Sequence, residues 1–122
     1  MPCRGIRGAI TVEVNERGAM LAATRRLLEQ IVAANGVGVD DVASVLFTVT
    51  PDLDALCPAV AAREMGWTAT PLLCVQEMAV PGSLPRCIRV LIHWNTERAQ
   101  ADIHHVYLGE ARILRPDLTN SE

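Results

Sequence analysis

The sequence contains no lysine. Its eleven cationic residues are all arginines, and fourteen aspartates and glutamates give a formal net charge of −3 at pH 7. Without a basic excess the chain has little affinity for a phosphate backbone, so we expect no nucleic-acid partner. Any anion site must then depend on guanidinium groups, which bind carboxylates through two parallel hydrogen bonds.

Long apolar segments are also lacking. The longest stretch without a charged residue, 65–76, has twelve residues and includes a proline, whereas a membrane-spanning helix needs about 20 apolar residues. Arg4, Arg7 and Glu13 interrupt the apolar sequence near the N-terminus, which argues against a signal peptide. We therefore expect no membrane association and a cytoplasmic location.

The common motifs of covalent, redox and metal chemistry are missing as well. No Gly-x-Ser-x-Gly sequence, phosphate-binding glycine loop or dinucleotide fingerprint occurs. His93, His104 and His105 do not have the spacing of a metal site. No C-x-x-C pair occurs, so we expect the four cysteines to be free and mostly buried thiols: Cys3, Cys57, Cys74 and Cys87.

Apolar residues, by contrast, are plentiful. Half of the 122 residues are hydrophobic, although only 3% are aromatic. This composition is far too apolar for a disordered chain, and the length fits one domain, 1–122. A domain this small has a large surface for its volume, so part of the apolar surface is expected to face another subunit. We therefore predict a single-domain oligomer.

The periodicity of apolar residues predicts five strands and two helices. A stripe at helical spacing follows Asn15, which is the expected N-cap, and glycines at positions 36 and 66 are expected to end the helices. The predicted strands are 3–14, 43–50, 67–74, 86–95 and 105–114, the helices are 15–35 and 58–65, a helical turn lies within 96–103, and 115–122 is a polar tail. The order β-α-β-α-β-β-β is that of a small α/β domain.

Arg89 and Glu77 are the most unusual charged residues. Arg89 lies in a segment that is apolar on both faces, which is typical of a central strand covered on both sides. A buried arginine requires an anionic partner, and Glu77, which follows the preceding strand, is one candidate. Two interpretations remain open. The pair is either an internal salt bridge that serves the fold, or a site where Arg89 binds an anion and Glu77 accepts a ligand hydroxyl.

Three further residues also have both a functional and a structural interpretation. Arg7 lies on the polar face of the first strand, beside Gly8 and other small residues that leave space for a ligand, yet a solvated arginine is the commoner case. Tyr107 either donates its phenol to an anion or packs in the core. Arg63, on the second helix, faces solvent by default. Such arginines, one carboxylate and one phenol suit the binding of a small anion and chemistry that needs no nucleophile.

Several separated motifs resemble those of one enzyme family. They run in order from position 4 to about position 118: Arg4-Gly5-Ile6-Arg7-Gly8-Ala9, Thr11-Val12-Glu13, Thr50-Pro51-Asp52-Leu53, Gln76-Glu77-Met78, Cys87-Ile88-Arg89-Val90, His105-Val106-Tyr107-Leu108 and Leu114-Arg115-Pro116-Asp117-Leu118. With this set the chain resembles the small monofunctional chorismate mutases of the trimeric pseudo-α/β-barrel type.

The resemblance implies both a fold and an activity. The implied α+β fold is a five-stranded mixed sheet with helices on one side, in a homotrimer that forms a pseudo-α/β-barrel. Its active sites would lie in clefts between neighbouring subunits. The implied activity is the isomerisation of chorismate to prephenate by a Claisen rearrangement, on the route to phenylalanine and tyrosine, without a metal, a cofactor or a covalent intermediate.

The resemblance also implies roles for individual residues. Arg89 would donate to the ether oxygen and a carboxylate of chorismate, Arg7 with Tyr107 would bind a carboxylate, and Glu77 and Cys74 would lie near the ring hydroxyl. Arg89, Glu77 and Arg7 are thus the implied catalytic residues. The complete implied substrate-binding set is Arg7, Cys57, Arg63, Cys74, Glu77, Arg89, Tyr107, Leu114 and Arg115.

The outer part of the implied site departs from the family pattern at two positions. Arg63 matches an arginine at the mouth of the cleft, and Leu114 with Arg115 match the start of a tail that covers the ligand. Cys57, however, stands where members often carry phenylalanine, and Val60 where a lysine can help to attract the dianion.

Two other functions use similar residues. A trimeric regulatory or carrier module that binds a carboxylated metabolite without transforming it would need the same arginines. A small trimeric imine deaminase would use an arginine and an activated water, but its signature residues are not recognisable in this sequence.

Overall fold

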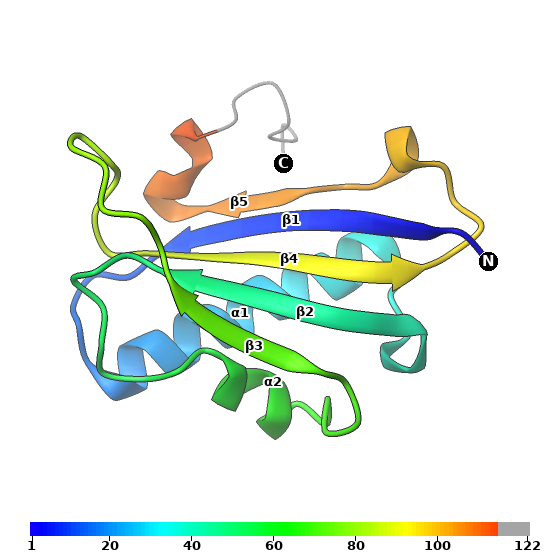
Figure 1. The fold of residues 1–122 in the computed structure, drawn as a ribbon, viewed down its shortest axis with the longest axis horizontal. Helices are drawn as coiled ribbons and strands as arrows, with labels where there is room; N and C mark the ends of the chain where they lie inside the picture. The colour runs from blue at the N-terminus through cyan, green and yellow to red at the C-terminus, as the bar shows by residue number, and fades with distance from the viewer. Residues whose placement is uncertain (115–122) are drawn as a thin grey trace.

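The fold is a five-stranded mixed sheet accompanied by two α-helices (Figure 1). A computed structural model describes residues 1–114. The strands are β1 (Cys3–Thr11), β2 (Val42–Val49), β3 (Leu72–Gln76), β4 (Cys87–Asn95) and β5 (Val106–Leu108), in the sheet order β3-β2-β4-β1-β5. β4 is antiparallel to β1 and β2, whereas the edge strands β3 and β5 are parallel to their neighbours. The predicted mixed sheet of five strands is confirmed.

Both helices pack on the same face of the sheet. α1 (Arg17–Asn35) crosses behind the sheet in Figure 1, and α2 (Ala59–Glu64) packs against α1 and β3. The core between them contains Phe47 of β2 and Ile92 of β4, neither of which is exposed. Its other large side chains include Ile6, Met20, Leu27, Leu28, Ile31 and Ile88. Burying these apolar side chains is the main force that holds the helices to the sheet.

The N-cap of α1 differs from the prediction. The Glu16 side chain, not Asn15, accepts a hydrogen bond of 2.8 Å from the Ala19 backbone N–H. Asn15 instead binds the loop that follows β2. Its side-chain oxygen accepts hydrogen bonds of 3.1 Å from the backbone N–H groups of Asp54 and Ala55. At the C-terminus the prediction is confirmed, since Gly36 adopts the left-handed conformation with φ of 73°.

The second face of the sheet is open in the single chain. β4 was expected to be covered on both sides, but only alternate residues such as Val90 and Ile92 are buried, whereas Arg89, Leu91 and His93 on the other face are half-buried. The reason is that both helices lie on one side. The open face also exposes apolar side chains of β3, with Leu73 60% and Val75 39% exposed.

Three strands are shorter or displaced relative to their predicted ranges, and the first of them, β1, ends at Thr11 instead of position 14. β3 begins at Leu72 because the chain first forms a loop that buries Trp67 in the core. β5 ends at Leu108 because Gly109 adopts a φ of 61°, which starts a 3₁₀ helix over Gly109–Ile113. The Thr11 hydroxyl accepts a hydrogen bond of 3.0 Å from the Glu110 N–H and fixes this turn against β1.

Shorter elements complete the described part of the chain. Two further 3₁₀ turns span Val39–Asp41 and Gln100–Asp102, and the second confirms the helical turn expected within 96–103. No helix in residues 1–114 is both long enough and apolar enough to span a bilayer. The predicted tail 115–122, which includes Arg115, lies outside the described residues.

Candidate active site

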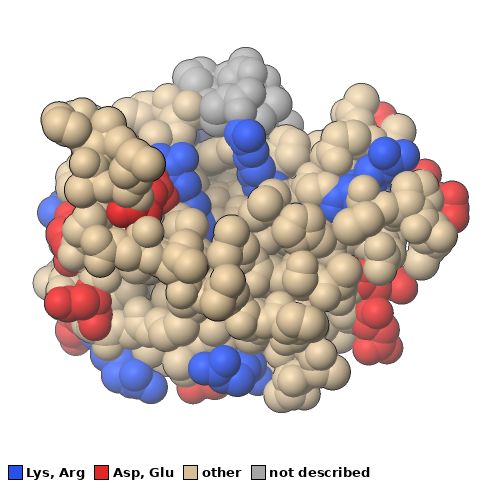
Figure 2. All heavy atoms as spheres, viewed as in Figure 1, with Lys and Arg blue, Asp and Glu red and all other residues tan. Residues whose placement is uncertain are grey.

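A cleft of about 720 Å³ lies on the open face of the sheet. Arginine side chains, blue in Figure 2, gather around a hollow on this face. The cleft is bounded by the three central strands, by the segment that follows β3, and by β5 with the turn after it. Its lining residues are Arg7, Gly8, Leu46, Thr48, Gln76, Glu77, Met78, Arg89, Val90, Leu91, Tyr107 and Leu114.

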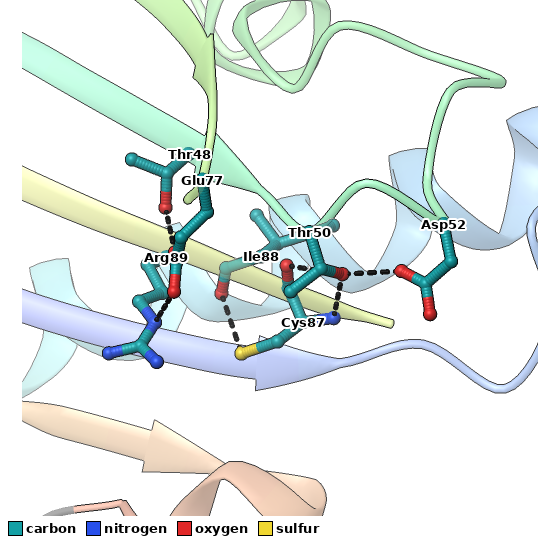
Figure 3. A network of polar contacts seen from close by, with 7 residues as sticks. All are labelled: Thr48, Thr50, Asp52, Glu77, Cys87, Ile88 and Arg89. Atoms are coloured by element: carbon teal, nitrogen blue, oxygen red, sulfur yellow. Dashed lines mark hydrogen bonds and ion pairs between the residues drawn. The ribbon is translucent and has the colours of Figure 1, made fainter. Parts of the chain in front are cut away.

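Arg89 and Glu77 form an ion pair inside this cleft (Figure 3). Arg89 Nε lies 3.0 Å from Glu77 Oε2, with the two side chains 41% and 22% exposed. The predicted anionic partner of Arg89 is therefore confirmed, although the guanidinium is half-buried and not enclosed. Arg89 Nε itself is buried and contacts Glu77 as an ion pair.

The Glu77 carboxylate has a second partner, Thr48. The Thr48 hydroxyl donates a hydrogen bond of 2.7 Å to Glu77 Oε1. Strand pairing places Thr48 of β2 opposite Arg89 of β4, so both side chains emerge on the open face. The Glu77 backbone N–H also donates to the Val49 oxygen at 2.8 Å, which continues the β2–β3 ladder by one residue. Thr48 thus holds one oxygen of the Glu77 carboxylate, and Arg89 contacts the other.

Arg7, Tyr107 and Leu114 line the other side of the cleft. Arg7 is exposed on β1, and its backbone N–H donates to His105 Nδ1 at 2.9 Å, which fixes β1 to the segment before β5. Tyr107 is 4% exposed and packs with Ala9 and other small residues on the open face. Leu114 packs against the same group. The structure therefore brings Arg7, Glu77, Arg89, Tyr107 and Leu114 to one cleft.

Close packing against α1 requires a glycine at position 8. A Cβ at Gly8 would lie 2.8 Å from Ile31 Cδ1 and 3.2 Å from Leu27 Cδ1, both on α1. The backbone of Gly8 does line the cleft, but the space beside it on the helix face is filled. The missing Cβ of Gly8 therefore serves packing against α1, and the backbone of Gly8 borders open space on the cleft side.

Cys57, Cys74 and Arg63 form a second group, away from the cleft. Cys74 pairs with Phe47 in the β2–β3 register, so its side chain is directed to the helix face, where Sγ accepts a 3.4 Å hydrogen bond from the Ala59 N–H. Burial raises the pKa of Cys74 to about 12, the neighbouring Cys57 thiol adds to the rise, and Arg63 opposes it. Cys57 and Arg63 themselves are exposed.

The cysteines are free, as predicted, but they are not mostly buried. Cys3 and Cys57 are exposed, Cys74 is half-buried, and only Cys87 is buried. Burial raises the pKa of Cys87 to about 11, although the nearby Arg89 charge lowers it. The expectation failed because cysteine is apolar enough for the core yet small enough for a loop or a strand end.

Thr48 is the site residue that the sequence did not reveal. Threonine is common in strands, and its contact with Glu77 depends on how β2 pairs with β3 and β4. Alternation along β2 does place Thr48 and Leu46 on one face, but it does not identify the strands on either side. No local pattern therefore distinguishes Thr48.

Comparisons with known proteins agree with this geometry. The sequence pattern of the family described as chorismate mutase type I matches residues 3–118. The chain belongs to the type I chorismate mutase family. It is 52% identical over 120 residues to the chorismate mutase AroH of Thermus thermophilus, covering 98% of each chain. It is 47% identical over 120 residues to the chorismate mutase AroH of Bacillus subtilis, covering 98% of this chain and 94% of the relative.

The fold of this chorismate mutase family member also matches a solved structure. The chorismate mutase from Clostridium thermocellum superposes with a TM-score of 0.88 and 51% sequence identity, over 89% of this chain and 97% of that one. The family resemblance and the five-stranded mixed sheet expected from it are confirmed. Membership of the family assigns the chain chorismate mutase activity, within aromatic amino acid biosynthesis.

Proposed function

We propose that the cleft on the open face binds chorismate and converts it to prephenate by a Claisen rearrangement. The observation that carries this proposal is the position of two arginines in one cleft: Arg89 beside Glu77, and Arg7 on a neighbouring strand. Chorismate carries two carboxylates, so two guanidinium groups on rigid strands match its charge. The Arg89 side chain is 41% exposed beside Glu77, so it remains accessible to a ligand in the cleft.

Arg89 is proposed to stabilise charge that develops during the reaction. The rearrangement breaks a C–O bond while a C–C bond forms, so negative charge gathers on the departing ether oxygen. A guanidinium held at that oxygen binds the transition state more tightly than the substrate, and this difference lowers the barrier. By analogy with other fixed donors, we assign Arg89 on the order of 3 to 4 kcal/mol of barrier lowering.

The cleft is proposed to restrain the conformation of the substrate as well. The two reacting carbons meet only in a compact conformer, and clamps on both carboxylates hold that conformer. Arg7, with the Tyr107 phenol, is the proposed clamp on β1 and β5. Glu77 is the proposed partner of the ring hydroxyl, and its negative charge lies on the side where the ring becomes electron-poor.

The active form is proposed to be a homotrimer with its sites at subunit interfaces. Arg89 and Cys74 project from opposite faces of the sheet, so one chain does not bring all the proposed residues to one ligand. The exposed apolar side chains Leu73 and Val75 on the open face favour burial against a neighbouring subunit. In this arrangement Arg63 and Cys57 of one subunit complete the cleft of the next.

The free thiols fit a reducing compartment, which supports a cytoplasmic location.

A turnover assay tests the proposed function. Purified protein is mixed with chorismate, and the loss of its ultraviolet absorbance is followed together with the formation of prephenate. We expect decay well above that of a buffer control, with one prephenate formed per chorismate consumed. Decay no faster than the buffer control, despite measurable binding of chorismate, would reject the enzyme in favour of a carrier or regulatory module.

A further inference from the structure

We propose that Thr48 is a positioning residue, which holds the Glu77 carboxylate in a position that leaves Arg89 available to the substrate. The inference rests on the proposed function and assigns a task that neither Arg89 nor Glu77 performs alone. Three observations carry it: the hydrogen bond from Thr48 to Glu77, the rigid place of Thr48 in the sheet, and the weak anchoring of Glu77.

Thr48 lies on β2, a strand that is paired on both sides within the sheet. β2 is flanked by β3 and β4, and Thr48 is paired with Val75 on one side and with Arg89 on the other. Pairing with both neighbouring strands fixes its Cα, and the restricted χ1 of threonine limits where its hydroxyl points. The hydroxyl is therefore a fixed donor directed at Glu77.

Glu77, in contrast, stands where the chain leaves the sheet. It follows the last residue of β3, an edge strand, and one backbone hydrogen bond to Val49 holds it there. The next residues, from Met78 to Ser83, are exposed. A glutamate side chain in this position has several accessible rotamers, so its carboxylate needs a partner on the sheet to occupy one of them.

The consequence for Arg89 follows from the geometry of the pair. Carboxylates and guanidinium groups prefer a bidentate contact with two parallel hydrogen bonds. In the structure Thr48 donates to Oε1 at 2.7 Å, and Oε2 lies 3.0 Å from Arg89 Nε (Figure 3). Without the hydroxyl, both carboxylate oxygens are free to bind the guanidinium. Glu77 would then compete with the substrate for the group that stabilises the transition state.

The test compares Thr48→Val with Thr48→Ser. Valine has nearly the shape of threonine and suits a strand, so the fold should remain and the melting temperature checks this. We expect Thr48→Val to lower kcat/KM roughly tenfold, mostly through kcat, because the charged groups are displaced from the reacting atoms. Thr48→Ser, which keeps the hydroxyl, should recover most of this loss.

A double-mutant cycle separates positioning from a merely structural effect. In a Glu77→Ala background there is no carboxylate to hold, so Thr48→Val should cause little further loss of kcat/KM. Binding of a bicyclic, dianionic transition-state analogue by calorimetry gives the same comparison where turnover is too slow. The inference would be overturned if Thr48→Val lowered kcat/KM equally in both backgrounds. It would also be overturned if the wild type were active and Thr48→Val had the same kcat/KM. A wild-type protein without turnover would instead reject the proposed function.

Discussion

Arg89 meets two requirements that usually oppose each other: its charge is stabilised in the empty protein, yet a donor remains for an anion. Glu77 supplies the stabilisation at 3.0 Å from the buried Nε, and the Arg89 side chain is still 41% exposed in the cleft. The type and strand position of Arg89 were enough to predict an anionic partner. Thr48 was not predictable, because its role depends on pairing between strands that are distant in sequence.

The thiols should differ in their reactivity toward an alkylating reagent. Burial raises the pKa of Cys74 to about 12 and that of Cys87 to about 11, so both remain protonated at neutral pH, and only a thiolate reacts. We expect iodoacetamide at neutral pH to modify the exposed Cys3 and Cys57 first and to leave Cys74 and Cys87 unmodified in the folded protein. Peptide mapping by mass spectrometry measures this order. Modification of Cys74 as fast as Cys3 would contradict it.

At the scale of secondary structure elements, contacts between β1 and α1 limit which residues can replace the glycine at position 8. Gly8→Ala should destabilise the fold by about 1 to 3 kcal/mol, because the new methyl group overlaps side chains of α1. Gly5→Ala is the matched control, since a Cβ there would be 3.6 Å from Leu91 Cδ1, an ordinary contact. Urea unfolding of both variants measures the difference. Equal stability of the two variants would show that α1 moves to make room.

The Asp52 carboxylate, which accepts a hydrogen bond from Arg86 just before β4, should make the free energy of unfolding depend on pH. Burial disfavours the charged form of Asp52, but hydrogen bonds from the Thr50 hydroxyl and the Arg86 backbone N–H outweigh it and lower the pKa of this carboxyl below 3.8. The folded state then binds its proton less readily than the unfolded state. The stabilisation is therefore complete well above pH 3.8, begins to decrease as the pH approaches that value, and disappears as the pH falls through the lowered pKa.

An unfolding series across this range tests the contribution of Asp52. The free energy of unfolding should fall more steeply with decreasing pH below about pH 5 in the wild type than in Asp52→Asn. Other carboxylates titrate in both proteins, so the difference between the two curves isolates Asp52. Parallel curves would mean that the network joining Asp52 to Thr50 and Arg86 does not stabilise the fold.

The elements themselves were predicted well where periodicity is strong and poorly where backbone conformation decides. The long helix and the central strands follow the apolar pattern, because burial on one face dictates it. The fifth strand ends early because Gly109 adopts positive φ, and an alternating pattern over 105–114 contains no sign of this. The third strand begins late because Trp67 enters the core from a loop.

At the scale of the whole molecule, the apolar composition predicted association, and the open face shows where the apolar surface lies. The composition did not reveal that the proposed site residues divide between two faces of the sheet, since this requires the strand register. We expect a solution mass of three times 13.2 kDa by light scattering. Leu73→Arg should shift the protein toward monomers and reduce its activity. A fully active monomer would contradict an interface site.

Mixing two inactive variants tests whether neighbouring subunits share a site. Arg63→Ala and Arg89→Ala each remove one arginine, and we expect each homotrimer to lose most of its activity. If the two arginines of a site come from different subunits, unfolding and refolding the mixture should restore roughly a quarter of the sites by random assembly. No recovery from correctly assembled mixed trimers would mean that both arginines act within one subunit.

The most direct test of the central claim is the kcat for prephenate formation by Arg89→Ala. The control is Arg25→Ala, which removes an exposed arginine of α1 that pairs with Glu29. We predict that Arg89→Ala lowers kcat by at least about 100-fold while the trimer and its melting temperature persist, and that Arg25→Ala keeps wild-type turnover. Wild-type kcat in a folded Arg89→Ala trimer would contradict the proposal that a guanidinium at the ether oxygen stabilises the transition state.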